Sequence, residues 1–322
     1  MNNITLYFPP INKLGNVSFR RVVASAGAHF VFTEMTRVEK ILEEDEHQLR
    51  KVIIPKNMAD KTIVQLICDD IKNLEEGIKK VLEINPFIFE INYNMGCPQS
   101  SMCSNEMGGG IVGNSEKVEM IAKELFRVCT KYKLKPSIKI RIGLDRNNLK
   151  KGEGDPITIY ENVKRIKSVG IKKIYIHGRC LRDGYHRPAT HEEIKKVKEE
   201  NEDIEIIANG DITDSSSLNS ILSLTGCQSA LVGRAALEDP YIFKELLSTQ
   251  GYTRKKQGRS LLDIKDALLE FLRYVIEDKL SISQIKHNLM YMSKNTIGGA
   301  EFREKLNNSN DVEELRDFCK EL

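Results

Sequence analysis

The sequence lacks the features that mark several classes of protein. None of its seven cysteines belongs to a C-x-x-C pair, so neither a disulfide framework nor a zinc ribbon is expected. No run of about 18 apolar residues occurs, so no membrane span is predicted. The opening residues do not join a basic region to a long apolar run, so no signal peptide is expected, and a reducing cytoplasm is the predicted compartment. The net charge of only +3 does not by itself indicate a nucleic-acid binder.

Short β-rich apolar runs alternate with amphipathic helical patterns over the first 250 residues. We predict strands at residues 4–8, 29–35, 62–68, 87–94, 137–142, 173–179, 204–211 and 229–235, with helices that include 157–170, one beginning at Ser115 and one capped by Thr190. This alternation favours an α/β fold, a (β/α)8 TIM barrel. The alternative is an open doubly wound sheet, which would carry G-x-G-x-x-G after the first strand, where PPINKLGN stands instead.

The pattern changes after about residue 252. The segment RKKQGRS is polar and basic, as in a linker, and the sequence from Leu261 onward shows helical patterns and no β-rich run. We therefore expect a catalytic barrel domain at residues 1–250, followed by a small all-helical domain at residues 251–322.

Polar and ionisable residues lie within or just beyond most of the predicted strands. In chain order they are Gln65; Asn94 and Cys97; Lys139 and Arg141; His177 and Arg179; Asn209, Gly210 and Asp211; Gly233 and Arg234. Chemistry in a TIM barrel sits at the carboxyl ends of the strands. Burial alone does not explain so many, because buried charges are costly unless they are paired.

Each of these residues also has a plain structural interpretation. Cys97 alone would be a buried thiol, Lys139 a solvated strand residue, and His177 a hydrogen-bonded core histidine. Together they indicate a ligand site, because loops after the last two strands of such barrels often bind phosphate, and Arg234 matches a phosphate through its planar fork. A phosphate anchor with the Lys139 cation facing a flat ring fits flavin mononucleotide (FMN), and no residue spacing here matches a metal site.

The motifs resemble those of the tRNA-dihydrouridine synthases, from roughly Pro9 to Leu306. The most specific match is NMGCP followed by the glycine-rich stretch MGGGIVGN, and the supporting motifs are FRR, GAHFVFTEM, VQL, IKIRIG, IHGR, ANGDI, VGRAAL and the tail KHNLMYMSKNTIGGAEFREKLN. The resemblance implies reduction of the C5=C6 bond of a uridine in tRNA, with FMN as cofactor and NADPH or NADH as reductant. It also implies hydride transfer to C6 and a proton from Cys97 to C5.

The resemblance carries over to particular residues. The residues that match the family's FMN contacts are Pro10, Ile11, Gln65, Lys139, His177, Asn209, Gly210, Asp211, Gly233 and Arg234. Those that match positions near the flavin or the target base are Asn94, Arg141 and Arg179. The implied partner is tRNA, held in part by the helical domain, and we expect no membrane, no metal and a monomer.

The sequence departs from the family pattern at a few positions. Pro9-Pro10-Ile11 stands where A-P-M is usual, and Cys180 stands where threonine is common. Cys103 is interpreted as a spare thiol on the substrate loop. Arg182, Tyr185, His186 and Arg187 are either RNA contacts or an ordinary solvated loop.

Two other functions remain open at this point. An FMN barrel acting on free pyrimidines, similar to dihydroorotate or dihydropyrimidine dehydrogenases, carries N-x-S-C-P-N, whereas Gly96 and Gln99 flank Cys97-Pro98 here. A flavoprotein that has lost activity and only binds RNA is disfavoured by the intact Lys139, His177, Arg234 and Cys97.

Overall fold

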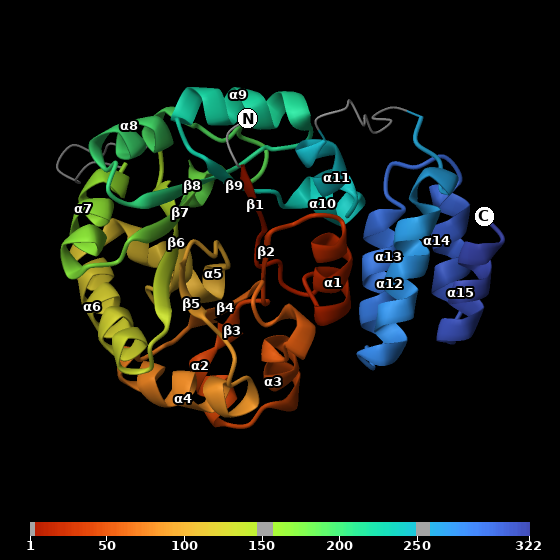
Figure 1. The fold of residues 1–322 in the computed structure, drawn as a ribbon, viewed down its shortest axis with the longest axis horizontal. Helices are drawn as coiled ribbons and strands as arrows, with labels where there is room; N and C mark the ends of the chain where they lie inside the picture. The colour runs from red at the N-terminus through yellow and green to blue at the C-terminus, as the bar shows by residue number, and fades with distance from the viewer. Residues whose placement is uncertain (1–3, 147–156, 249–257) are drawn as a thin grey trace.

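Eight parallel strand positions close into a barrel surrounded by helices (Figure 1). The computed structural model describes residues 4–146, 157–248 and 258–322. The strands are β1 (Thr5–Phe8), β2 (Phe30–Phe32), β3 (Thr36–Arg37), β4 (Thr62–Ile67), β5 (Glu90–Met95), β6 (Lys135–Gly143), β7 (Lys173–Cys180), β8 (Glu205–Asn209) and β9 (Ser229–Leu231). The ladder runs from β1 through β2 and then β4 to β9, and β9 pairs with β1. The predicted TIM barrel is confirmed.

Two predicted strands are shorter than the sequence pattern suggested. The strand predicted at 29–35 is present only as β2, which ends at Phe32. Thr33–Met35 lies between it and β3, which begins beyond the predicted range; both strands pair with β4. There, Thr33 Oγ1 accepts a hydrogen bond from the Gln65 amide at 3.0 Å, and a Glu34 carboxylate oxygen accepts one from the Lys13 amide. The strand predicted at 229–235 ends at Leu231, since Gly233 is the N-cap of a helix that begins at Arg234.

The helices pack around the outside of the barrel, and the last four lie to one side (Figure 1). They are α1 (Val17–Ser25), α2 (Val38–Leu42), α3 (Glu46–Val52), α4 (Leu74–Ile84), α5 (Ser100–Cys103), α6 (Ser115–Lys131), α7 (Ile159–Val169), α8 (Glu192–Glu200), α9 (Ser215–Thr225), α10 (Arg234–Glu238), α11 (Ile242–Leu247), α12 (Lys265–Glu277), α13 (Ile282–Met292), α14 (Gly299–Asn308) and α15 (Val312–Lys320).

The helix predicted to begin at Ser115 does begin there, as α6, whereas the cap predicted at Thr190 was wrong by one residue. The side chain of Asn114, rather than Ser115, caps α6 by accepting from the Lys117 amide at 3.0 Å. Thr190 does not cap α8, which begins at Glu192; its amide donates to Gly178 O instead. Neighbouring residues of similar polarity compete for a cap, and the fold decides which one faces the free amides.

The helical C-terminal region packs against α1, the first helix of the barrel. Phe271 of α12 is fully buried, and its ring meets Phe19 of α1 with centroids 6.2 Å apart. Beside this contact, Asp278 accepts hydrogen bonds from Ser18 Oγ at 2.8 Å and from Arg21 at 3.0 Å. The predicted boundary between residues 250 and 251 lies outside the described residues, so the division into two domains stays a prediction.

The interior of the barrel changes character along the strand direction. Its lower part is an apolar cluster that includes Tyr7, Phe32, Ile63, Tyr175, Ile207 and Leu231. Two residues further along the chain stand Gln65, His177 and Asn209 on their strands and Gly233 just beyond the end of β9. Side chains two apart share a face of a strand, so the interior turns polar toward the carboxyl ends of the strands. This polar end is the candidate site.

Candidate active site

Strand register brings the predicted site residues onto one level of the barrel. Asn94 lies opposite Lys139 in the β5–β6 pair, and Arg141 lies opposite His177 in the β6–β7 pair. His177 is in turn opposite Asn209 on β8. These residues come from four consecutive strands, so their grouping follows from the parallel order of the sheet.

Cys97 lies on a tight turn directly after β5. The Asn94 side-chain oxygen accepts the amides of Gly96 at 3.0 Å and Cys97 at 2.9 Å, and Asn94 is itself 6% exposed. Arg141 Nε donates to Gly96 O at 2.6 Å from the neighbouring strand. Three hydrogen bonds therefore fix a turn of two residues, and its direction is set by side chains on β5 and β6.

The glycine-rich segment that follows packs against this turn. The Gly109 amide donates to Cys97 O at 2.8 Å. A Cβ atom at Gly109 would stand 3.0 Å from Cys97 O and 2.5 Å from a Leu181 methyl carbon, and one at Gly108 would stand 3.1 Å from Cys97 Cβ. Because side chains would not fit here, the glycines allow the backbone to close over the Cys97 turn.

Cys97 and Cys103 are half-buried, whereas the other five cysteines are buried. Burial raises the pKa of Cys68, Cys129 and Cys319 to about 12, as expected for inert core thiols. The Cys103 thiol donates to Cys97 O at 3.4 Å, so it lies behind the turn on the segment of α5.

Positive charge gathers beside the Cys97 turn. Desolvation, reinforced by the nearby Arg141, lowers the pKa of Lys139 to about 7, with the Cys97 thiol acting in the opposite sense. Within the described residues, no hydrogen bond or ion pair to the Lys139 ammonium is present. Burial also lowers the pKa of Arg141. The pKa of His177 falls well below its usual value through burial and then through the surrounding cations, so its ring is neutral.

Asp211, just after β8, supplies a negative charge at the carboxyl end of the barrel. Arg179 NH2 donates to both of its carboxylate oxygens at 2.6 and 2.7 Å, and Arg234 NH2 donates to one at 2.7 Å. Burial by itself raises the pKa of Asp211, but the hydrogen bonds from Arg179 and the Ala189 amide, with the charges of both arginines, bring it below its ordinary value. The exposed ring of Tyr185 lies under the Arg234 guanidinium, 4.6 Å from its carbon.

The remaining predicted contacts lie at the rim or within the wall. Gln65 is fully buried, and its side-chain amide bonds to Asn92 and Asn94. Pro10 and Ile11 are half-buried in the turn after β1, where Ile11 O accepts the Gly15 amide at 2.8 Å. A Cβ atom at Gly233 would meet one atom only, Pro9 Cγ at 3.3 Å, so the backbone is accessible there.

Sequence reasoning did not single out Glu90, Asn92 and Ser137. All three are fully buried in the barrel interior and hydrogen-bonded to one another. The signal was present, because Glu90 interrupts the apolar run FIFEINY, and a buried carboxylate needs a partner. The partner, Lys173 at 3.0 Å, is 83 residues away along the chain and was not predictable from spacing.

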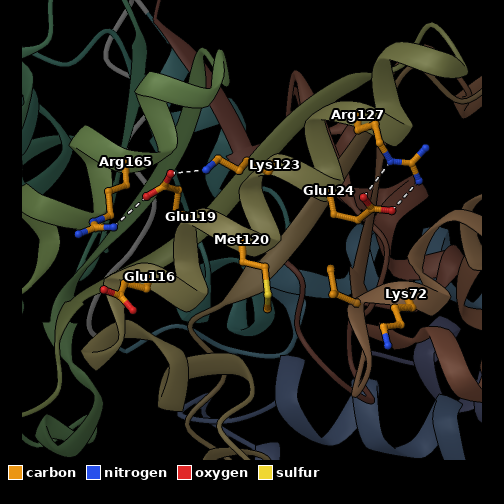
Figure 2. Close-up of a pocket in the computed structure, with 9 residues that line it drawn as sticks. Lys72, Glu116, Glu119, Met120, Lys123, Glu124, Arg127 and Arg165 are labelled. Carbon is orange, nitrogen blue, oxygen red and sulfur yellow. Dashed lines mark hydrogen bonds and ion pairs between the residues drawn. The ribbon is translucent and has the colours of Figure 1, made fainter.

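One surface hollow of about 650 Å³ lies away from the barrel mouth, along the outer side of α6 (Figure 2). Its charges neutralise one another, since Glu119 pairs with Lys123 at 2.5 Å and Arg165 at 2.8 Å, and Arg127 pairs with Glu124 at 2.6 Å. No cysteine or histidine lines it. The barrel mouth therefore remains the candidate site.

The described residues contain no group of three or more His, Cys, Asp or Glu side chains arranged to hold a metal ion. Among the same residues, no helix is long and apolar enough to cross a membrane.

Comparison with known proteins identifies the family. A profile described as dihydrouridine synthase (Dus) matches residues 8–322. This chain belongs to the dihydrouridine synthase family. It is 28% identical over 315 residues to tRNA-dihydrouridine synthase B of Pseudomonas aeruginosa, covering 96% of this chain and 89% of that protein. It is 26% identical over 306 residues to a probable tRNA-dihydrouridine synthase of Rickettsia conorii, covering 94% of this chain and 88% of that protein.

A solved structure supports the fold of this family member. Histamine dehydrogenase from Rhizobium sp. 4-9 superimposes with a TM-score of 0.53 at 11% identity. The match covers 91% of this chain and 49% of that longer protein. At this identity the likeness concerns the fold alone, and it agrees with the closed barrel described above.

Proposed function

We propose that this protein is a tRNA-dihydrouridine synthase, which reduces the C5=C6 bond of a uridine in tRNA with FMN as cofactor and NADPH or NADH as reductant. The observation that carries the proposal is the half-buried Cys97 thiol on a rigid turn at the barrel mouth, beside Lys139 and Arg141, in a chain of the dihydrouridine synthase family. A monomeric state and a cytoplasmic location belong to the same proposal.

The residues at the mouth fit an anionic, planar cofactor. Lys139 is half-buried, and its ammonium has no partner among the described residues, next to Arg141 and the neutral His177. A site with this excess of positive charge favours an anion. FMN offers a phosphate and an electron-rich ring edge, and when reduced it supplies the hydride for C6 of the uracil.

The proposed contacts divide between the ring and the phosphate. Gln65, Lys139 and His177 would face the ring from the wall of the barrel, and Asn209 would border it on β8. The open backbone at Gly210 and Gly233, with Arg234, would receive the phosphate. In this structure Arg234 donates to Asp211, so Asp211 would share the arginine with the phosphate and hold its guanidinium in place. Pro10 and Ile11 would close the rim after β1.

Cys97 would donate the proton to C5 of the uracil. A thiol is uncharged at neutral pH and still releases its proton readily, which suits protonation of a carbon next to a carbonyl. Asn94 and Arg141 contribute by holding the turn, through the Gly96 and Cys97 amides and Gly96 O. Arg179, which is 2% exposed and bound to Asp211, would act from beneath the site rather than touch the base.

The target uridine must leave the tRNA stack to reach a site inside a barrel mouth. The helical region would help to position the tRNA through phosphate contacts that weaken with salt. Three basic residues of this region already have internal partners: Arg259 pairs with Asp239 at 3.0 Å, Lys286 donates to Asn307 O, and Arg303 donates to Ser293 O at 2.7 Å. Other residues of the surface would therefore carry most of the phosphate contacts.

The deciding experiment uses the purified holoprotein with NADPH and an unmodified tRNA transcript, followed by mass-spectrometric mapping of dihydrouridine. We expect one or a few uridines to gain two mass units. Absence of any modified uridine, in a protein that binds flavin and oxidises NADPH, would contradict the proposal. Free uracil and orotate are assayed in parallel, and their turnover without RNA would favour the free-pyrimidine enzymes instead.

A further inference from the structure

We propose that Glu90, Ser137 and Asn92 are positioning residues that hold the Cys97 turn from inside the barrel, acting through Gln65 and Asn94. The catalytic meaning of this proposal rests on the function proposed above. The structural part concerns only hydrogen bonds and can be tested without any reaction.

A continuous hydrogen-bonded chain runs along the inner wall of the barrel, from Glu90 on β5 through side chains of β4, β5 and β6 to the Cys97 turn. The Ser137 hydroxyl donates to Glu90 at 2.7 Å, and Asn92 Nδ2 donates to Ser137 Oγ at 2.9 Å. Gln65 Nε2 donates to Asn92 Oδ1 at 2.8 Å, and Asn94 Nδ2 donates to Gln65 Oε1 at 2.7 Å. The chain ends where Asn94 Oδ1 accepts the two amides of the turn.

The two ends of this chain impose the same direction on every hydrogen bond. Glu90 is ion-paired with Lys173 at 3.0 Å and accepts from the Tyr175 hydroxyl at 3.1 Å, so it serves as an acceptor for Ser137. At the other end, backbone N–H groups are donors without exception. The three amide side chains between them have one orientation that satisfies both ends, and reversing any one of them would place two donors or two acceptors face to face.

Because these side chains are buried, reversing the direction of any hydrogen bond in the chain would be costly. Glu90, Ser137, Asn92 and Gln65 are all 0% exposed, so water is not available to replace a lost hydrogen bond. If Asn92 no longer held Gln65, the Gln65 amide would be free to turn. Asn94 could then turn its amino group toward the turn amides, donor facing donor, and the Cys97 turn would lose its anchor.

The test compares two substitutions at one position. Asn92→Leu keeps a similar volume but removes both hydrogen bonds, and so releases Gln65. Asn92→Asp keeps the acceptor for Gln65 Nε2. Its carboxyl, held neutral by burial beside Glu90, donates its own O–H to Ser137 Oγ as the Asn92 amide does, so it preserves the orientation of Gln65. We expect hydrogen exchange of the peptide that contains Gly96 and Cys97 to be about tenfold faster in Asn92→Leu and within about twofold of wild type in Asn92→Asp.

Activity provides the second measurement. In a single turnover of tRNA by pre-reduced holoprotein, uridine reduction should slow by about tenfold in Asn92→Leu and recover in Asn92→Asp. Reduction of the flavin by NADPH should change by no more than about threefold in either variant, because Gln65 is only one of the proposed ring contacts and that step does not involve the Cys97 turn. A merely destabilised barrel would not divide the two steps in this way.

Asn85→Ala is the matched control. Asn85 is also a buried asparagine, bonded to Ile54 N at 3.0 Å and Val52 O at 2.7 Å, but it lies at the end of α4 and takes no part in the chain. We expect it to lower stability and leave exchange at Gly96 and Cys97 unchanged.

Wild-type exchange and uridine reduction in folded, flavin-bound Asn92→Leu would overturn the proposal. If that variant does not fold, Ser137→Ala replaces it: it removes the acceptor for Asn92 Nδ2, and about threefold faster exchange at the turn is expected. Unchanged exchange in folded Ser137→Ala would equally overturn it. Should the wild-type protein not reduce tRNA uridine, the proposed function fails while the exchange result still decides the role of the chain.

Discussion

Flavin binding should become weaker as the pH rises from 7 to 9, and Lys139 is the reason. Desolvation and Arg141 lower the pKa of its ammonium to about 7 in the ligand-free protein. FMN selects the protonated form, because the Lys139 ammonium would face the electron-rich edge of the flavin ring, where the neutral amine carries no positive charge. As the pH rises through 7 the free protein loses this proton, and binding must restore it, so the affinity falls.

The magnitude follows from the fraction of protein that is ready to bind. With a pKa of about 7, half of the Lys139 side chains are protonated at pH 7. At pH 9 the fraction is about one in a hundred, so the dissociation constant should rise by about 50-fold over this range. The flavin phosphate does not contribute, since its second pKa of about 6 leaves it a dianion throughout. His177 does not contribute either, because its pKa lies well below its usual value.

The assay is a fluorescence titration of the flavin-free protein with FMN at several pH values and constant ionic strength. Lys139→Met should bind more weakly at pH 7 and show a flat profile between pH 7 and 9. Arg234→Ala should bind more weakly at every pH and keep the slope, and Cys97→Ala should also keep it. A change of less than threefold in the wild-type protein, or the same slope in Lys139→Met, would refute the reasoning.

Three further predictions concern other parts of the molecule. Cys97→Ala should retain flavin and lose at least about 100-fold in the single-turnover rate of uridine reduction, whereas Cys103→Ala should react at close to the wild-type rate. The opposite result would show that Cys103, rather than Cys97, donates the proton. Gly210→Ala should lower stability by about 1–3 kcal/mol in denaturant unfolding, because Gly210 has φ of +137° and its new Cβ would stand 2.6 Å from Ala189 Cβ. Phe271→Ala should lower the free energy of unfolding by about 3–5 kcal/mol. Calorimetry should show a single transition at a lower temperature. A second transition at the wild-type temperature would show that the helical region unfolds separately from the barrel.

Much of the fold was predictable because hydrophobic periodicity reports local structure. Each predicted strand has a counterpart in the sheet, and most of the error concerns ends, such as the early ends at Phe32 and Leu231. Ends depend on which polar group satisfies a particular amide, as Asn114 does for α6, and several neighbours in the sequence are suitable.

The grouping of the site was also accessible from the sequence, since it needs only the barrel rule and strand order. What the sequence did not reveal is how the site residues are engaged. Gln65 was expected at the flavin, and its amide is also bonded to Asn92 and Asn94 inside the wall. Arg234 was expected at a phosphate, and it also holds Asp211. Such partners lie on different strands, and no pattern within one strand encodes them.

The sequence by itself determined the alternation of strands and helices, the strand-end positions of Cys97, Lys139 and His177, and the motifs shared with the family, because these depend on residues close together in the chain. Only the tertiary structure decided the direction of the Cys97 turn and the ionisation of Lys139. Both depend on burial and on Arg141 of β6, and the turn depends also on Asn94 of β5 and Gln65 of β4. A pKa or a hydrogen-bond direction is a property of that assembled environment rather than of the residue.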